Sequence, residues 1–277
     1  MFAAEPLEGN QLAVVHDADA LGEVTMLAFA RETGLSETTF VQSPTEPGAT
    51  YRNRIWWSHG EMPFAGHPSL GTAVAVALRR GEGEARYVQQ TPAGLQPVEV
   101  QLSADGARAQ ASMLQEPAVF GPEPDAAAAL AAVGLDPQDG HPELPPQVVG
   151  TGLTHLLIPV RDPHVLHRCA PQLEALLAAL SPHGAGCAYV VAVDPDLGIA
   201  QARSFFEGRL SAVEDPATGS AAGPLCAYLQ QRCGGERVMV DQGVAMGRPS
   251  RIVAEMDGDR VRVSGDVVIV ATGDVRL

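Results

Sequence analysis

The chain has 277 residues, 45% hydrophobic and 18% charged, which is typical of a folded globular protein. Its net charge is −15 and its longest basic run is Arg79-Arg80, so nucleic acid and anionic membrane surfaces are excluded as expected partners. The sequence shows no signal-peptide pattern and no apolar stretch near about 18 residues. We therefore expect a soluble, cytoplasmic protein.

The N-terminal part predicts short strands around one small-residue helix. Apolar and β-branched residues predict strands at 12–15, 38–41 and 51–57, with a helix at 21–33 that Gly34 ends. A second helix is predicted from Pro68 to Arg80, rich in Ala and Val and therefore buried on most sides. Three further strands are predicted at 86–90, 98–102 and 109–113.

The C-terminal part repeats this alternation. Residues 116–125 contain three prolines and are predicted to be a linker. A small-residue helix is predicted at 220–232, after Asp215-Pro216. The other predicted helices are 126–133 and 170–180, and the predicted strands are 156–160, 188–193, 202–206, 238–240, 250–255, 261–264 and 267–271.

One internal repeat links the two parts. Residues 61–67 and 214–220 share the pattern E-x-P-x-x-G-x, and each stands just before a small-residue helix. Chance recurrence of common residues is the alternative, but the similar context favours duplication. We expect an α+β fold of two pseudo-symmetric domains, each a curled, mostly antiparallel sheet around a central helix. The expected bounds are 1–115 and 125–277, with the last strand free to return to the N-terminal half.

The two repeated turns are candidate anion sites. His67 precedes Pro68 and is therefore expected near a helix N-cap, where Gly66 lets a ligand approach the backbone. The Thr218-Gly219-Ser220 turn offers the same backbone donors and two hydroxyls. Free N–H groups and the helix dipole attract anions, although most helix N-termini bind nothing.

Two carboxylates are candidates for acid–base chemistry. Glu37 stands between a predicted helix and a predicted strand, where burial would suit it to proton transfer. Its alternative is a solvated loop residue. Asp215 precedes Pro216, and its alternative is simple turn initiation.

The cysteines and the remaining histidines lack the spacing of a metal site. The four cysteines have no C-x-x-C pair, and we expect buried thiols in a reducing compartment. The absence of G-x-S-x-G, P-loop and G-x-G-x-x-G patterns leaves hydrolase, NTPase and dinucleotide-binding functions without support. No role is assigned to His16, His59, His141, His155, His164, His167 and His183.

Five stretches stand in order along nearly the whole chain: 9–15, 35–41, 63–73, 214–221 and 242–250. Together they resemble the PhzF-like family of phenazine-biosynthesis proteins. The resemblance implies a diaminopimelate-epimerase-like fold with the active site between its two domains. It also implies a cofactor-independent, metal-free isomerase that acts on a small carboxylate and is commonly a homodimer. The best-known member isomerises a dihydro-hydroxyanthranilate.

The resemblance also assigns roles to residues. It implies that Glu37 is the acid–base and that His67 and Asp215 line the same pocket. It further implies a strand ahead of Phe2, most of which this chain lacks. The expected substrate-binding groups are those of Gly66, Thr218, Gly219 and Ser220.

Two other functions remain open at this point. A binding protein that keeps the fold without turnover is one, although the intact Glu37, His67 and Asp215 argue against it. An amino-acid racemase or epimerase is the other. In the wider superfamily racemases carry two thiols immediately before the glycine of each turn, where this chain has Ala65 and Thr218.

Overall fold

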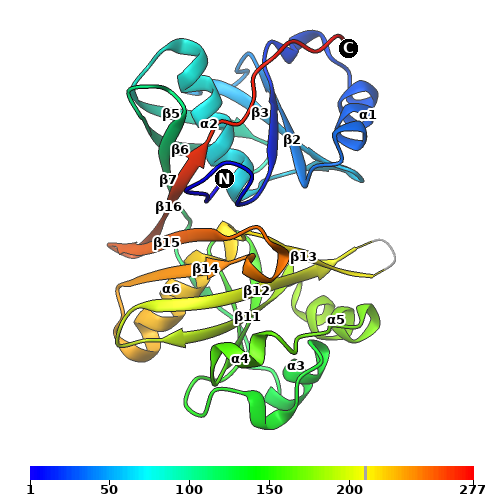
Figure 1. Cartoon of the computed structure of the whole chain (residues 1–277), viewed down its shortest axis with the longest axis vertical. Coiled ribbons are helices and arrows are strands. Elements are labelled where there is room, and N and C mark those ends of the chain that lie inside the picture. Colours follow the sequence, from blue (N-terminus) through cyan, green and yellow to red (C-terminus); the bar gives the residue numbers. More distant parts are fainter. Residues whose placement is uncertain (209–210) are drawn as a thin grey trace. The chain divides into compact units, whose positions relative to one another are not determined.

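The computed structural model describes residues 1–208 and 211–277, which form two compact units (Figure 1). Unit 1 comprises residues 1–113 and 264–277, and unit 2 comprises residues 114–263. The last strand, β16 (Arg260–Val268), begins in unit 2 and ends in unit 1. The segment 116–125, predicted to be a linker, lies within unit 2 and contains the short strand β8 (Val119–Phe120).

Unit 1 is a mixed sheet wrapped on one long helix. The strand order is β1-β2-β3-β5-β6-β7, with β4 paired to β3. Strands β1 and β2 are parallel, as are β3 and β5, and the other neighbours are antiparallel. The elements are β1 (Leu12–Val15), η1 (Ala18–Ala20), α1 (Glu23–Thr33), β2 (Glu37–Gln42), β3 (Tyr51–Trp57), β4 (Gly60–Met62), α2 (Gly66–Arg80), β5 (Glu84–Thr91), β6 (Gly94–Leu102) and β7 (Arg108–Leu114).

Helix α2 is the core of unit 1. Of its 15 residues, 11 are buried, because Ala, Gly, Ser and Val side chains let the surrounding strands approach closely. It packs against β1, β2, β3, β5 and β6 (Figure 1). Its exposed end carries Arg79 and Arg80, whose charges favour a helix C-terminus, and Gly81 ends it in a left-handed conformation.

Unit 2 repeats this organisation with additional helices. The strand order is β15-β14-β12-β11-β10-β9-β8, with β13 paired to β12, and α6 packs against β9, β10, β14 and β15. The elements are α3 (Ala126–Ala132), η2 (Pro137–Asp139), β9 (Gln147–Gly150), β10 (Thr154–Val160), α4 (Pro163–Leu166), α5 (Leu173–Leu180), η3 (Ser181–His183), β11 (Cys187–Asp194), β12 (Ile199–Glu207), β13 (Ala212–Asp215), α6 (Gly219–Cys233), β14 (Arg237–Gln242), η4 (Val244–Met246) and β15 (Ser250–Asp257).

The succession of strand pairings is the same in both units. A parallel pair (β1–β2, β10–β11) is followed by an antiparallel neighbour (β3, β12) and a hairpin partner (β4, β13). A 15-residue helix comes next (α2, α6), and the chain then returns parallel to the same strand as β5 or β14. The repeated sequence pattern thus marks the same hairpin-to-helix turn in each unit.

The first residue of the repeat has the same partner type in both units. Glu61 accepts two hydrogen bonds from Arg54 across the β3–β4 hairpin, with Nη2 and Oε2 2.7 Å apart. Glu214 accepts two from Arg203 across β12–β13, at 2.9 and 2.6 Å. Such paired guanidinium–carboxylate contacts fix a hairpin's geometry as well as its charge. Each guanidinium also lies over an aromatic ring two residues later, Trp56 at 5.5 Å and Phe205 at 4.9 Å.

Three sequence-based expectations differ from the structure. Helix α2 begins at Gly66, so His67 is its second residue and Ala65 is the N-cap. Pro68 is then the third residue of the helix. It fits there because the N–H groups of the first helical turn have no acceptor within the helix, so the N–H that proline lacks is not needed. The two strands predicted at 261–264 and 267–271 form the single strand β16, which ends at Val268. Cys233 is exposed, whereas the other three thiols are buried as predicted.

Within residues 1–208 and 211–277, no helix is long and apolar enough to span a membrane.

The close approach of Gln115 to α6 makes Gly223 critical for stability. A methyl group at Gly223 would lie 1.8 Å from Oε1 of Gln115, which accepts from Thr151 at 2.5 Å. We expect Gly223→Ala to lower the free energy of unfolding by about 3 kcal/mol, through overpacking and loss of buried hydrogen bonds. Urea denaturation measures this free energy of unfolding. Gly83→Ala is the control, because nothing lies within 4 Å of its added methyl; equal losses in both variants would contradict the expectation.

Candidate active site

The strongest constellation in unit 1 is a buried carboxylate facing an imidazole. Oε2 of Glu37 lies 3.0 Å from Nε2 of His67, with side chains 16% and 7% exposed. Both atoms are buried, yet within the described part of the chain neither has a hydrogen bond of good geometry. The two are therefore in contact without being aligned as donor and acceptor. Buried polar atoms in this condition call for an explanation, and a catalytic role is one that fits a carboxylate facing an imidazole.

The backbone brings these two residues together. Helix α1 ends at Thr33, and Gly34 reverses the chain with a φ of 63°, so that Glu37 opens β2. Two residues further on, on the same face of the strand, Thr39 shares a 2.7 Å hydrogen bond with Thr72 of α2. This bond holds β2 against α2 and keeps Glu37 beside the start of the helix.

Asn10 sets which ring nitrogen of His67 accepts a hydrogen bond. Strands β1 and β2 pair with Leu12 opposite Glu37, which brings Asn10 to the same end of the sheet. Nδ2 of Asn10 lies 3.2 Å from Nδ1 of His67, and an amide NH₂ is a donor only. Nδ1 therefore accepts, and the ring proton of neutral His67 sits on Nε2, facing Glu37.

Helices α2 and α6 both leave their first N–H groups available. Among the described residues, neither N-cap, Ala65 nor Thr218, makes a capping hydrogen bond through its side chain. The first N–H groups of a helix have no carbonyl acceptor within it, and they lie at the positive end of its dipole. Each helix start can thus bind an anion. The N–H groups concerned belong to Gly66 and His67 in unit 1, and to Gly219 and Ser220 in unit 2.

In unit 2 a glutamine organises the turn that carries Asp215. The Thr218 hydroxyl donates to Oδ2 of Asp215 at 2.6 Å. Nε2 of Gln242 donates to the Asp215 carbonyl at 2.7 Å and to the Thr218 hydroxyl at 3.0 Å. Its Oε1 accepts from the Thr218 N–H and from Tyr189. Gln242 is 1% exposed, and this set of bonds holds the Asp215–Thr218 turn in one conformation.

Gly243 lets this arrangement form. Its φ is 74°, a left-handed conformation that side chains disfavour. A methyl group there would lie 2.5 Å from the carbonyl oxygen of Pro216. The strand end at Gln242 can therefore approach the turn closely only with glycine at the next position.

A neutral thiol–imidazole pair lies beneath the start of α6. Sγ of Cys187 is 3.1 Å from Nδ1 of His155, and both residues are buried. Burial raises the pKa of Cys187 to about 12 and lowers the pKa of His155 to about 4, against a raising effect of the Ser220 backbone. At neutral pH the pair is a thiol and a neutral ring, unlike the thiolate of a nucleophilic cysteine.

The sequence matches the family described as phenazine biosynthesis-like protein (PhzC-PhzF) over residues 1–273. The chain belongs to this family. It is 36% identical over 275 residues to trans-2,3-dihydro-3-hydroxyanthranilate isomerase of Pseudomonas aeruginosa, covering 95% of this chain and 90% of that protein. It is 35% identical to an uncharacterized isomerase of Mesorhizobium japonicum, covering 99% and 95%.

A solved structure agrees with the fold. The phenazine biosynthesis protein of the PhzF family from Bacillus anthracis matches with a TM-score of 0.83 and 25% identity, covering 97% of this chain and 94% of that one. The predicted family is thereby confirmed, as is the α+β class with a mixed sheet. The relatives named isomerases match over nearly their full lengths, in agreement with the enzyme class expected from the sequence.

The structure places each predicted site residue of this PhzF-family chain in one of two clusters. Glu37, His67 and Gly66 are together in unit 1. Asp215, Thr218, Gly219 and Ser220 are together in unit 2.

Sequence reasoning did not assign roles to Asn10 and Gln242. Both stand in stretches that carry the family resemblance, 9–15 and 242–250, which was the available signal. A buried amide has no periodicity or spacing pattern of its own. Its importance appears only when the partner, distant in sequence, is known.

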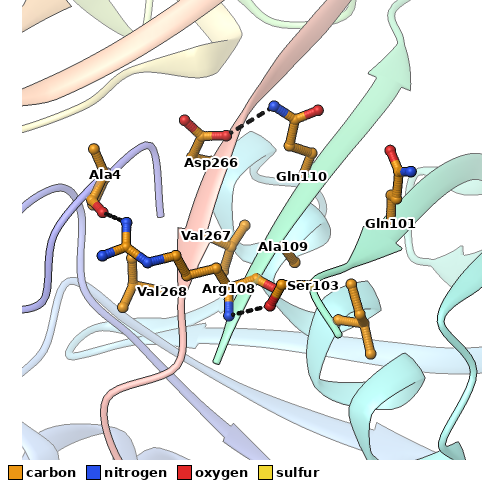
Figure 2. Close-up of a pocket in the computed structure, with 11 residues that line it drawn as sticks. Ala4, Gln101, Ser103, Arg108, Ala109, Gln110, Asp266, Val267 and Val268 are labelled. Atoms are coloured by element: carbon orange, nitrogen blue, oxygen red, sulfur yellow. Dashed lines mark hydrogen bonds between the residues drawn. The ribbon is translucent and has the colours of Figure 1, made fainter. Parts of the chain in front are cut away.

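Unit 1 also contains a groove of about 370 Å³ (Figure 2). It runs beside β6, β7 and β16, and several of its polar side chains already have partners. Arg108 donates to the Ala4 carbonyl and to Glu5, and Gln110 donates to Asp266 at 3.1 Å. None of the predicted site residues lines it. The groove is therefore not the candidate active site.

No cluster of three or more His, Cys, Asp or Glu side chains suited to a metal ion occurs among the described residues.

The tautomer of His67 is open to measurement. In Asn10→Asp a carboxylate would accept a proton from Nδ1, so we expect the ring to gain an Nδ1 proton that the wild type lacks. Long-range ¹H–¹⁵N NMR of the imidazole distinguishes the two forms. Asn53→Asp is the control, because Asn53 is equally buried in unit 1 but donates to Gln89. An Nδ1 proton already present in the wild type would refute the assignment.

The buried His155 predicts a pH dependence of stability. Burial lowers its pKa from the ordinary value of 6.5 to about 4 in the folded protein, so only the unfolded chain takes up a proton between these values. Stability should therefore fall as the pH is lowered through this window, by about 2 kcal/mol between pH 7 and 4.5. In His155→Gln we expect this pH-dependent loss of stability to disappear. Urea denaturation at the two pH values measures it, and His164→Gln, at an exposed histidine, is the control. An unchanged pH dependence in His155→Gln would contradict it.

Proposed function

We propose that this PhzF-family protein is a cofactor-independent isomerase that moves a proton on a small carboxylate-bearing substrate. Glu37 is the acid–base. The observation that supports this most strongly is the buried contact of Glu37 with His67, in which the carboxylate oxygen has no well-aligned donor among the described residues. Such an oxygen keeps its lone pairs available for a substrate C–H.

The proposed reaction conserves the atoms of the substrate. The Glu37 carboxylate takes a proton from one substrate carbon, the double bond shifts, and the same carboxyl group, after exchange of its proton with solvent, protonates another carbon. His67 faces Glu37 with its Nε2–H, whose position on the ring Asn10 sets, and this N–H is available to orient the substrate beside the carboxylate. No redox partner is needed, because the substrate is neither oxidised nor reduced overall.

Binding of the substrate carboxylate is proposed for the helix starts. The N–H groups of Gly66, Gly219 and Ser220 and the hydroxyl of Ser220 are the donors, in keeping with the absence of side-chain caps among the described residues. The Thr218 hydroxyl donates its proton to Asp215, so Thr218 contributes by holding Asp215 beside the helix start. Asp215, hydrogen-bonded to Thr218, would share in protonating the substrate. Under this proposal, both clusters act on a single substrate.

We further propose that the two units are duplicated halves of a diaminopimelate-epimerase-like fold. Support comes from the identical succession of strand pairings, the two 15-residue helices and the matched Arg–Glu pairs. The N-cap positions carry Ala65 and Thr218, so a racemase mechanism with two thiols at these positions has no support. The homodimer implied by the family resemblance stays a prediction.

The first substrate to test is trans-2,3-dihydro-3-hydroxyanthranilate, after the named Pseudomonas aeruginosa relative. It carries the expected features, a ring carboxylate and a double bond that can move. Its amino and hydroxyl groups also offer partners for polar side chains. The uncharacterized isomerases among the relatives leave other cyclic carboxylates as further candidates.

The role of Glu37 predicts the loss of proton transfer in a conservative variant. Glu37→Gln keeps the shape of the side chain but cannot accept a proton. We expect kcat to fall by about 10²- to 10⁴-fold, and solvent deuterium to stop entering the product. Mass spectrometry of the product formed in D₂O measures this incorporation.

The matched control is Glu32→Gln, an exposed glutamate on α1 whose substitution should leave both quantities unchanged. Full deuterium incorporation by Glu37→Gln would remove Glu37 as the acid–base. A wild type that turns over no cyclic carboxylate, but captures one stoichiometric protein partner, would contradict the isomerase proposal itself.

A further inference from the structure

A set of buried polar side chains beneath the first turn of α6 is unused in the proposed reaction. It consists of Gln115 with Thr151 and His155 with Cys187, which we call the α6 clamp. All four side chains are nine-tenths or more buried. Polar groups at this depth cost stability unless they are hydrogen-bonded, so their arrangement calls for a physical reason.

Gln115 holds the first carbonyl of α6. Its Nε2 donates to the Gly219 carbonyl at 3.1 Å, and its Oε1 accepts from the Thr151 hydroxyl at 2.5 Å. The Gly219 carbonyl and the Ser220 N–H belong to one planar peptide unit and point in opposite directions. A bond that fixes this carbonyl therefore also fixes the direction of the Ser220 N–H.

The second carbonyl of α6 lacks its usual donor. Pro224 lies inside the helix and has no N–H, so the Ser220 carbonyl, four residues earlier, cannot receive the regular α-helical hydrogen bond. Helices commonly bend or unwind at such a position. The first turn of α6 therefore needs support from outside the helix.

His155 is placed to give this support. It lies on β10, against which α6 packs. Its Nδ1 is in hydrogen-bond contact with the thiol of Cys187. If Nδ1 accepts from this thiol, the ring proton of the neutral imidazole is on Nε2. Nε2 is buried and has no well-aligned partner in residues 1–208 and 211–277, while the Ser220 backbone interacts with the ring and raises its pKa. A hydrogen-bond acceptor near an imidazole raises its pKa, whereas an N–H donor does not. The raising effect of Ser220 therefore assigns its carbonyl as the acceptor near the ring, although Nε2 and this carbonyl are not aligned as a hydrogen bond.

We propose that Gln115 and His155 are positioning residues for the substrate carboxylate. Gln115 directs the Ser220 N–H outward from the helix start, and His155 keeps the turn closed where Pro224 leaves it weak. Thr151 and Cys187 hold these two side chains in the required orientation. This inference rests on the proposed function, because it assumes that the carboxylate is bound at the start of α6.

Binding of an unreactive carboxylate tests this role separately from turnover. The probe is 2-aminobenzoate, and the measurements are its Kd and the shift of the Ser220 amide in ¹H–¹⁵N spectra of the full chain. In the wild type we expect the Ser220 amide to shift on binding. Gln115→Met and His155→Phe, which lack the N–H donor, should weaken binding by about tenfold. His155→Gln, which keeps a donor, should recover most of the affinity.

The matched control is Tyr228→Phe. It removes a 2.7 Å hydrogen bond from α6 to the Pro145 carbonyl, further along the helix. We expect it to lower stability but to leave the Kd of 2-aminobenzoate and the Ser220 shift unchanged. If Gln115→Met does not fold, Thr151→Val replaces it, because it removes only the donor to Oε1 of Gln115.

The outcomes distinguish a failure of the positioning role from a failure of the proposed isomerase function. Unchanged Kd in Gln115→Met or in Thr151→Val, equal weakening in Tyr228→Phe, or no response of the Ser220 amide in the wild type would overturn the positioning role. A wild type that binds 2-aminobenzoate with the expected Ser220 shift, but isomerises no cyclic carboxylate, would overturn the proposed function and leave the α6 clamp standing.

Discussion

Each unit depends on one constraint, a buried helix that starts without a side-chain cap in the part of the chain that the structure describes. A missing cap typically costs about 1 kcal/mol of helix stability. In α2 and α6 the helix is instead held from the sides, by strands that surround its small residues and by an Arg–Glu pair that fixes the preceding hairpin. The N–H groups at the helix start remain free of intrahelical acceptors, which suits them to an anionic ligand.

The two units differ chemically at matched positions. Phe40 is opposite Arg54 in unit 1, and Val190 is opposite Arg203 in unit 2. Phe40 of β2 and Val190 of β11 therefore occupy equivalent positions. Glu37 and Cys187 stand three residues before them, so these two residues are equivalent as well. Burial raises the pKa of this thiol to about 12, so it carries no charge at neutral pH. Similar backbones thus present the proposed acid–base group in one unit and an uncharged thiol in the other, which fits the proposal that one unit supplies the base and the other binds and orients the substrate.

Elements set by local pattern were predictable from the sequence, and contacts between distant segments were not. The strands at 12–15 and 51–57 have the predicted bounds, because their apolar and β-branched runs end at clear turn residues. The sequence of β16 is interrupted by Gly265 and Asp266, which predicted two strands, but pairing with β7 and β15 keeps it continuous. For the candidate site, the family resemblance predicts Glu37 and His67, whereas the amides of Asn10 and Gln242 bind partners 57 and 24 residues away, which no local pattern indicates.

The central claim is that Glu37 acts on a substrate whose carboxylate is bound by a helix start. A crystal structure of the protein with 2-aminobenzoate tests it most directly. The account predicts the ligand carboxylate on the N–H groups of Gly219 and Ser220, with Glu37 within about 3.2 Å of the ligand or one water away. A ligand bound in the groove beside Arg108, or at the start of α6 with Glu37 out of hydrogen-bond reach, would contradict it.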